Sequence, residues 1–154
     1  MKIYLAASWK KDIEVRTLAE MLRDDGFEVD CFADQSSGRF VFSFEDLGPI
    51  ENETAKTILQ REEVIMAFME DKKGMDWCDV LVALLPAGIS THMEAGYVKG
   101  QGKGLAFISP CGFPKGKVDV MYLFADAMCG SYTELVKFLK DFEEINGLCK
   151  EDAL

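Results

Sequence analysis

Glu94 is the residue of this chain whose type and position most directly suggest chemistry. It lies in the stretch STHMEAGYVKGQGK, which follows the apolar run VLVALLPAG and opens a predicted helix. A carboxylate in such a place is either a reactive group of an active site or a helix cap. Thr91 and Glu94 match the T-x-x-E capping box, in which the glutamate bonds back to the first amide of the helix. The local sequence leaves both interpretations open.

The elements that would position Glu94 follow from an alternation of short apolar runs with amphipathic segments, which is typical of parallel βαβ units. The spacing predicts strands over residues 2–7, 27–32, 79–86, 104–109 and near 126–130. It predicts helices over residues 12–25, 51–71, from about 91 onward, and over 131–145. The fold class that fits is α/β: a flavodoxin-like, doubly wound five-stranded parallel sheet with helices on both faces, in a single domain over residues 1–154.

This fold favours the reactive interpretation of Glu94. In open α/β sheets, ligands bind outside the carboxyl ends of the strands, which places residues 6–9, 86–94 and 109–113 on one rim. In the helix that starts near Thr91, Gly96 and Gly100 are four residues apart, and we expect this bare face to pack closely against a neighbour.

A long connection over residues 33–49 carries an aromatic cluster of Phe40, Phe42 and Phe44. Connections of this length usually cover a site. The rings equally fit a satellite hydrophobic cluster or a subunit contact, and the sequence does not decide between these roles.

Composition excludes several classes of function. The formal charge of −10 disfavours a nucleic-acid polymer, because affinity for such polymers comes largely from Lys and Arg neutralising phosphates. A single nucleotide stays compatible, since a few backbone amides can hold one phosphate. The five cysteines lack C-x-x-C spacing, which argues for reduced thiols and against a metal site. No apolar run approaches the ~18 residues of a membrane helix or suits a secretory signal, so we expect no membrane partner and a cytoplasmic location.

Three blocks of the sequence carry a family resemblance: KIYLAA at the start, an acid ahead of DWCDVLVALLP, and GISTHMEAGYVKGQGK. Together they resemble the nucleoside 2-deoxyribosyltransferase-like family, which includes the 2′-deoxynucleoside 5′-phosphate N-hydrolases. The order of elements agrees from residue 1 to about residue 139. The resemblance implies an enzyme that cleaves the N-glycosidic bond of a nucleoside or nucleotide, by hydrolysis or by transfer to a second base, and it implies no cofactor.

The resemblance also implies catalytic roles for three residues. In the family, the glutamate near the start of this helix attacks the anomeric carbon, an aspartate ahead of the third strand assists proton transfer, and a tyrosine of the first strand orients the nucleophile. The matching positions here are Glu94, Asp71 and Tyr4. Glu70 and Asp76 stay alternatives to Asp71 if the register differs by a few residues.

These residue types suit the chemistry. Breaking an N-glycosidic bond builds positive charge on the sugar, which a carboxylate stabilises and can trap covalently, as in retaining glycosidases. The leaving base needs a proton. Two carboxylates in one partly desolvated site repel each other, so one can keep its proton near neutral pH while the other stays ionised.

The substrate-binding residues expected around the rim are small, hydroxyl-bearing or aromatic. Ser8, Ser90 and Thr91 suit an anion at a turn or helix start, and aromatic rings can stack on a base. His92 is the only histidine, and packing stays the simpler interpretation for the aromatic rings. The full set is Ala6, Ser8, Trp9, Phe42, Phe44, Pro86, Gly88, Ser90, Thr91 and His92.

The chain departs from the family pattern at Gly88, where the transferases carry a sugar-binding aspartate six positions before the nucleophile. This departure leaves room for a second function class, a non-catalytic nucleotide-binding or sensor module on the same fold. The resemblance also implies a homo-oligomer, because sites in the family are completed by a neighbouring subunit.

Overall fold

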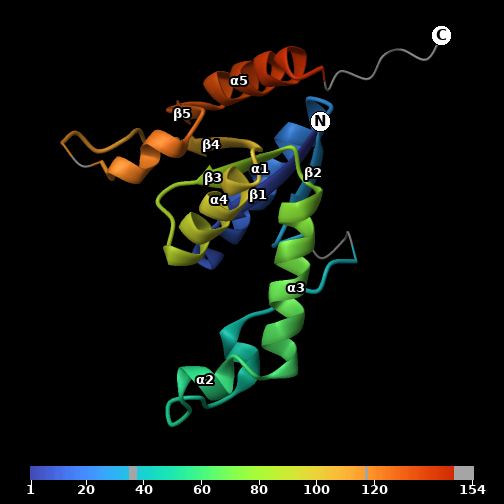
Figure 1. The fold of residues 1–154 in the computed structure, drawn as a ribbon, viewed down its shortest axis with the longest axis vertical. Coiled ribbons are helices and arrows are strands. Elements are labelled where there is room, and N and C mark those ends of the chain that lie inside the picture. The colour runs from blue at the N-terminus through green and yellow to red at the C-terminus, as the bar shows by residue number, and fades with distance from the viewer. Residues whose placement is uncertain (35–37, 117, 148–154) are drawn as a thin grey trace.

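The sheet has five parallel strands in the order β2-β1-β3-β4-β5 (Figure 1). The computed structural model describes residues 1–34, 38–116 and 118–147. The strands are β1 (Lys2–Ala7), β2 (Glu28–Cys31), β3 (Val80–Leu84), β4 (Gly104–Ile108) and β5 (Ala127–Cys129). The predicted flavodoxin-like fold class is therefore confirmed, and the continuous apolar sequence of β3 and β4 corresponds to complete burial on both faces.

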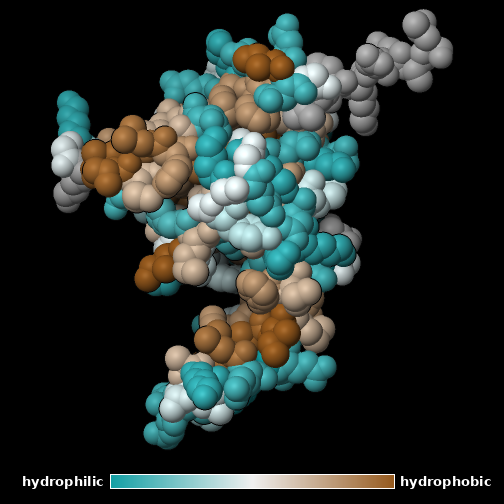
Figure 2. Space-filling view, in the orientation of Figure 1, coloured by the Kyte–Doolittle hydropathy of each residue, from teal (hydrophilic) through white to brown (hydrophobic). Residues whose placement is uncertain are grey.

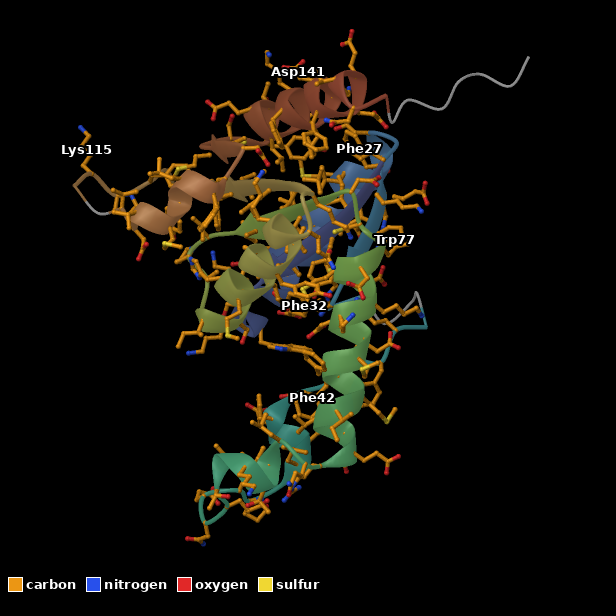
Figure 3. All side chains as sticks on the ribbon, viewed as in Figure 1. Phe27, Phe32, Phe42, Trp77, Lys115 and Asp141 are labelled. Carbon is orange, nitrogen blue, oxygen red and sulfur yellow. The ribbon has the colours of Figure 1, made fainter. Side chains whose placement is uncertain are left out.

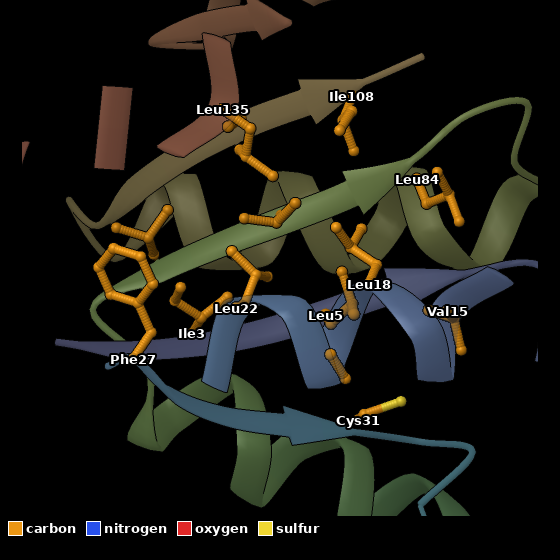
Figure 4. Packing of buried hydrophobic residues seen from close by; sticks show 14 of the residues in the cluster. Ile3, Leu5, Val15, Leu18, Leu22, Phe27, Cys31, Leu84, Ile108 and Leu135 are labelled. Carbon is orange, nitrogen blue, oxygen red and sulfur yellow. The ribbon is translucent and has the colours of Figure 1, made fainter. Parts of the chain in front are cut away.

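The helices cover both faces of this sheet. They are α1 (Asp12–Asp24), α2 (Ala55–Ile58), α3 (Glu62–Trp77), α4 (Ile89–Gly100) and α5 (Tyr132–Ile145), with 3₁₀ turns η1 (Trp9–Lys11), η3 (Phe44–Leu47) and η4 (Val120–Phe124). The core between the sheet and the α1–α5 layer (Figure 4) includes Ile3, Leu5, Leu22 and Leu135. Side chains alternate along a strand, so Tyr4 and Ala6 enter the opposite core, beneath α3 and α4.

The prediction of one helix over residues 51–71 is wrong. The chain forms the short α2, turns, and begins α3 only at Glu62, because Arg61 is extended and serves as the N-cap of α3. The side chain of Thr54 caps α2 by accepting a bond from the Thr57 amide. α3 then continues to Trp77, beyond the predicted end.

The first half of α3 projects from the sheet together with η3 and α2 (Figure 1), and we call residues 44–69 the arm. Only Gly74 and Met75 of α3 are buried. Part of the arm surface is strongly apolar (Figure 2). The large apolar side chains that it exposes are Phe44, Leu59, Ile65, Met66, Phe68 and Met69.

Close approaches within the chain occur at Gly74 and Gly104, whereas Gly96 and Gly100 have nothing within 4 Å of an added Cβ. The predicted packing of Gly96 and Gly100 against a neighbouring part of the chain is therefore wrong, and their packing against another subunit stays a prediction. A Cβ at Gly74 would lie 2.1 Å from Asp30 Oδ2 and 2.7 Å from Tyr4 Cδ2. The bare backbone of Gly74 therefore allows α3 to pack directly on β1 and β2.

Among the described residues, none of the helices combines the length and apolar character needed to cross a membrane.

We predict that Gly74→Ala lowers the free energy of unfolding by roughly 1–2 kcal/mol, because the steric cost of overpacking exceeds the gain in helix propensity. Gly96→Ala is the matched control in an open helix position and should raise stability by roughly 0.5–1 kcal/mol. Urea unfolding of the two variants measures both changes. Equal effects of the two substitutions would contradict a close contact at Gly74.

Candidate active site

Glu94 does not cap its helix. α4 begins at Ile89 with Gly88 as N-cap, and no side chain bonds to the first amides. The predicted capping box is wrong because Ile89 and Ser90 are already helical and glycine is an acceptable N-cap residue. Thr91 is consequently inside the first turn and 2% exposed. Glu94 lies beyond that turn, so its carboxyl group is available for a partner outside its own helix.

That partner is Tyr4. The Tyr4 hydroxyl donates a hydrogen bond of 3.3 Å to Oε1 of Glu94. Tyr4 is 1% exposed and lies in the core beneath α3 and α4. Burial raises the pKa of Tyr4 well above its ordinary value, and the nearby carboxyl of Glu94 raises it further. The hydroxyl therefore keeps its proton and acts as a fixed donor to Glu94.

Asp71 approaches the same place from α3, and a guanidinium accompanies it. Arg39 pairs with Asp71 through Nη2, and Arg39 Nη1 lies 2.5 Å from Oδ2 of Asp30 in β2. The guanidinium carbon lies 5.7 Å from the centre of the Tyr4 ring, and the Arg39 side chain is 5% exposed. Tyr4, Glu94, Asp71, Asp30 and Arg39 thus form one partly buried cluster beside β1.

The environment of this cluster makes Glu94 an unusual acid. Burial raises the pKa of Glu94 from its ordinary 4.5 to about 7, and the charge of Asp71 adds to the rise, while Tyr4 and Arg39 oppose it. Burial also raises the pKa of Asp71, but the charge and hydrogen bond of Arg39 oppose that rise. Of the two carboxyls, only Asp71 has a cation in direct contact.

The two alternatives to Asp71 face elsewhere. Asp76 is exposed and accepts bonds from Lys72, Tyr97 and Gln101 on the outer surface of α3 and α4. Glu70 lines a cavity of about 340 Å³ with Lys73, Gly74 and Trp77, on the side of Arg39 next to β2. Of the three acids, Asp71 is the one whose charge acts on Glu94.

Several expected substrate-binding residues lie around two other cavities. One of about 830 Å³ is lined by Pro86 with residues of the loop 109–119, and one of about 620 Å³ is lined by Gly88 and His92. His92 points away from Glu94. Its Nε2 lies 3.1 Å from the Tyr122 hydroxyl, and its ring stacks on that of Tyr122.

The remaining expected residues differ in exposure. Ala6 is buried at 1%, and Ser90 is exposed at the start of α4. The Ser8 hydroxyl accepts the Lys10 amide at 3.4 Å and so caps η1. Among the described residues, no hydrogen bond joins any of these three to Glu94.

The aromatic residues form two pairs. Trp9 is 47% exposed and packs on Phe32, with 4.8 Å between ring centres. Phe42 is 8% exposed and lies beside the projecting half of α3 (Figure 3). It packs edge-on against the exposed Phe44 at 5.3 Å. Of the three rings in the predicted aromatic cluster, Phe42 and Phe44 therefore pack on each other where the connection enters the arm.

Sequence reasoning missed Arg39 and Asp30. A signal was present in both cases. Asp30 is an acid within the apolar run FEVDCF, and a partly buried acid in a strand requires a cation or donor. Arg39 is the one basic residue of the connection 33–49. Assigning them to the site needed the fold, because Asp71, the second partner of Arg39, lies on α3, which is far from Arg39 in the sequence. Within the described residues, no group of three or more His, Cys, Asp or Glu side chains is arranged to hold a metal ion.

The raised pKa of Glu94 has a consequence for stability. The folded protein binds this proton more tightly than the unfolded chain does. The contribution of Glu94 to the free energy of unfolding is therefore fully present below about pH 4.5 and is lost as the pH rises through about 7. Glu94→Gln imitates the protonated form at every pH. We predict that it equals the wild type at pH 4.5 and exceeds it by about 1–3 kcal/mol at pH 8.

Urea unfolding at the two pH values measures this difference. Glu20→Gln, at an exposed position of α1, is the control and should leave stability unaltered at both. A Glu94→Gln effect that is the same at pH 4.5 and pH 8 would contradict the raised pKa.

Comparison with known proteins finds shared folds at low sequence identity. The chain is similar to the CMP N-glycosidase BcmB of Clostridium botulinum, with 18% identity, coverage of 91% of this chain and 99% of that one, and a TM-score of 0.50. It is also similar to a 2-deoxyribosyltransferase of Bacillus psychrosaccharolyticus, with 18% identity, coverage of 88% and 90%, and a TM-score of 0.59. No family model and no curated protein matches the chain. The chain thus shares its fold with proteins of the kind that its sequence resembles.

Proposed function

We propose that this protein cleaves the N-glycosidic bond of a nucleoside or nucleotide, with Glu94 as the nucleophile. The observation that carries the proposal is the Glu94 carboxyl itself. It is partly buried, bonded to a fixed tyrosine hydroxyl, and accompanied by a second carboxyl from another helix. Paired carboxyls with unequal environments are the usual equipment of glycosidic bond cleavage. The likeness in fold to an N-glycosidase and a deoxyribosyltransferase supports the same choice.

In the proposed reaction, the bond between the anomeric carbon and the base breaks as a carboxylate oxygen of Glu94 bonds to that carbon. The electron pair of the broken bond leaves with the base, which takes a proton from Asp71. Water or a second base then attacks the anomeric carbon, the bond from that carbon to Glu94 breaks, and the ionised Asp71 takes the proton that the attacking water or base loses, giving hydrolysis or transfer. Tyr4 acts by holding the Glu94 side chain in one rotamer and by stabilising its anion.

The position of Gly88 favours a second candidate, a non-catalytic nucleotide-binding or sensor module. Gly88 offers no side chain where the transferases carry a sugar-binding aspartate, and nothing lies within 4 Å of a Cβ placed there. A site that binds a nucleotide without turnover would fit this change. The two functions differ in one observable, the release of free base.

We also propose that two copies of the chain associate through the apolar surface of the arm. Ile65, Phe68 and Met69 are 48%, 59% and 55% exposed and lie on one helix. The net charge of −10 opposes association through charged faces, because like surfaces repel. Exposed apolar patches of this kind mark interaction sites.

We predict that Glu94→Gln abolishes base release, by on the order of 10³-fold or more, because glutamine cannot form the glycosyl ester. Tyr4→Phe should reduce the rate by roughly 10²-fold while the fold persists. The assay is chromatographic detection of free base from a panel of nucleosides, 2′-deoxynucleosides and their 5′-monophosphates. Glu20→Gln is the control with unchanged activity.

Intact mass spectrometry after incubation with 2′-fluoro nucleosides provides the direct test of the intermediate. A sugar adduct on the peptide that contains Glu94 is expected. Thermal stabilisation by a nucleotide, without a sugar adduct and without free base, would contradict the enzymatic function and favour the sensor module.

We predict that Phe68→Glu produces a monomer in sedimentation velocity, because a charge in the apolar surface of the arm prevents its burial. Ile13→Glu changes an equally apolar side chain, 72% exposed on α1, and should leave the assembly intact. A wild-type protein that is monomeric at all concentrations would refute the association.

A further inference from the structure

The site contains an electrostatic conflict that the proposed roles do not resolve. Asp71 can protonate a leaving base only while it carries a proton. In the free protein, however, Asp71 is in direct ionic contact with the guanidinium of Arg39. A carboxyl group in contact with a permanent cation is held as the anion. Burial raises the pKa of Asp71, but Arg39 opposes that rise and so favours the ionised form of the acid that the reaction requires in its protonated form.

Glu94 is in the opposite condition. Its carboxyl accepts a hydrogen bond from the neutral hydroxyl of Tyr4, and it faces the negative charge of Asp71. β3 and β4, the other strands beneath α4, carry no ionisable side chain. Arg39 acts on Glu94 only as the weakest of the four influences on this acid. When the two carboxyls share one proton, the proton resides on Glu94.

Arg39 is built into this position. Its side chain is 5% exposed, a second nitrogen pairs with Asp30, and its guanidinium carbon lies 5.7 Å from the centre of the Tyr4 ring. Asp30 in turn packs against the bare backbone of Gly74 on the helix that carries Asp71. Contacts with β1, β2 and α3 therefore fix the guanidinium beside Asp71 rather than in solvent.

We propose that Arg39 is a positioning residue that holds Asp71 as a carboxylate in the free protein and leaves the proton of the site on Glu94. A ligand whose base takes the place of Arg39 at Asp71 reverses the arrangement. The proton then passes from Glu94 to Asp71, with no net gain or loss, and this single transfer creates both the nucleophile and the acid. The inference rests on the proposed function for its purpose, but its test needs no turnover.

The test is the titration of the two carboxyl carbons by ¹³C NMR, with Asp71→Asn and Glu94→Gln used to assign the resonances. In Arg39→Gln, the midpoint of Asp71 should rise by about one pH unit or more, because the cation that favours its ionised form is lost. Arg39→Lys keeps the charge and should preserve the wild-type order. Arg61→Gln removes another arginine, which pairs with Glu53 in the arm, and should change neither midpoint.

A second measurement leaves Arg39 intact in case its replacement unfolds the protein. If Asp71 is ionised in the free protein, Asp71→Asn removes a negative charge and lowers the midpoint of Glu94 by about one unit. An unchanged Glu94 midpoint in Asp71→Asn, or unchanged midpoints in folded Arg39→Gln, would overturn the proposal. Shifted midpoints in a protein that releases no base would instead refute the proposed function and leave the role of Arg39 standing.

Discussion

The candidate site depends on how one guanidinium is divided among the acids beside β1. Each carboxyl taken partly out of water needs a cation or a donor in place of its hydration. Arg39 supplies Asp30 and Asp71, whereas the hydrogen bond that Glu94 receives within the described part of the chain comes from the hydroxyl of Tyr4. Because Arg39 opposes the effect of burial on Glu94 only weakly, burial raises the pKa of Glu94 to about 7. It also gives two chemically identical groups different protonation states within one small volume.

The fold produces this arrangement through two simple constraints. Alternation along β1 directs Tyr4 into the core beneath α3 and α4, where Glu94 is the polar group that it meets. Gly74 then lets α3 approach β1 and β2 closely enough for Asp71 and Asp30 to share Arg39. Neither constraint involves the arm or the cavities near β4 and β5.

The sequence predicted what depends on local pattern and missed what depends on distant partners. Continuous apolar runs identified β3 and β4, because a strand that is buried on both faces needs an apolar side chain at nearly every position. The capping-box interpretation is wrong because it requires Thr91 to be the N-cap residue. α4 begins at Ile89 instead, so Thr91 is already inside the helix. Arg39 was missed for a different reason: its partners come from β2 and α3, and only the packed fold brings these together.

The elements that carry the residues of the cluster are buried to different depths, and this difference decides which of these residues a ligand can displace. Tyr4 and Glu94 are anchored to the best-buried part of the molecule, since β1 and β3 are almost wholly covered. Contacts with β1, β2 and α3 hold the guanidinium of Arg39. The chain that follows Arg39, however, enters the arm, where α2 has no buried residue and α3 buries only Gly74 and Met75. Segments with few buried apolar contacts open at low free-energy cost. Of the charged groups in the cluster, Arg39 is therefore the one that a ligand can displace while the nucleophile, its tyrosine and the sheet beneath them stay in place.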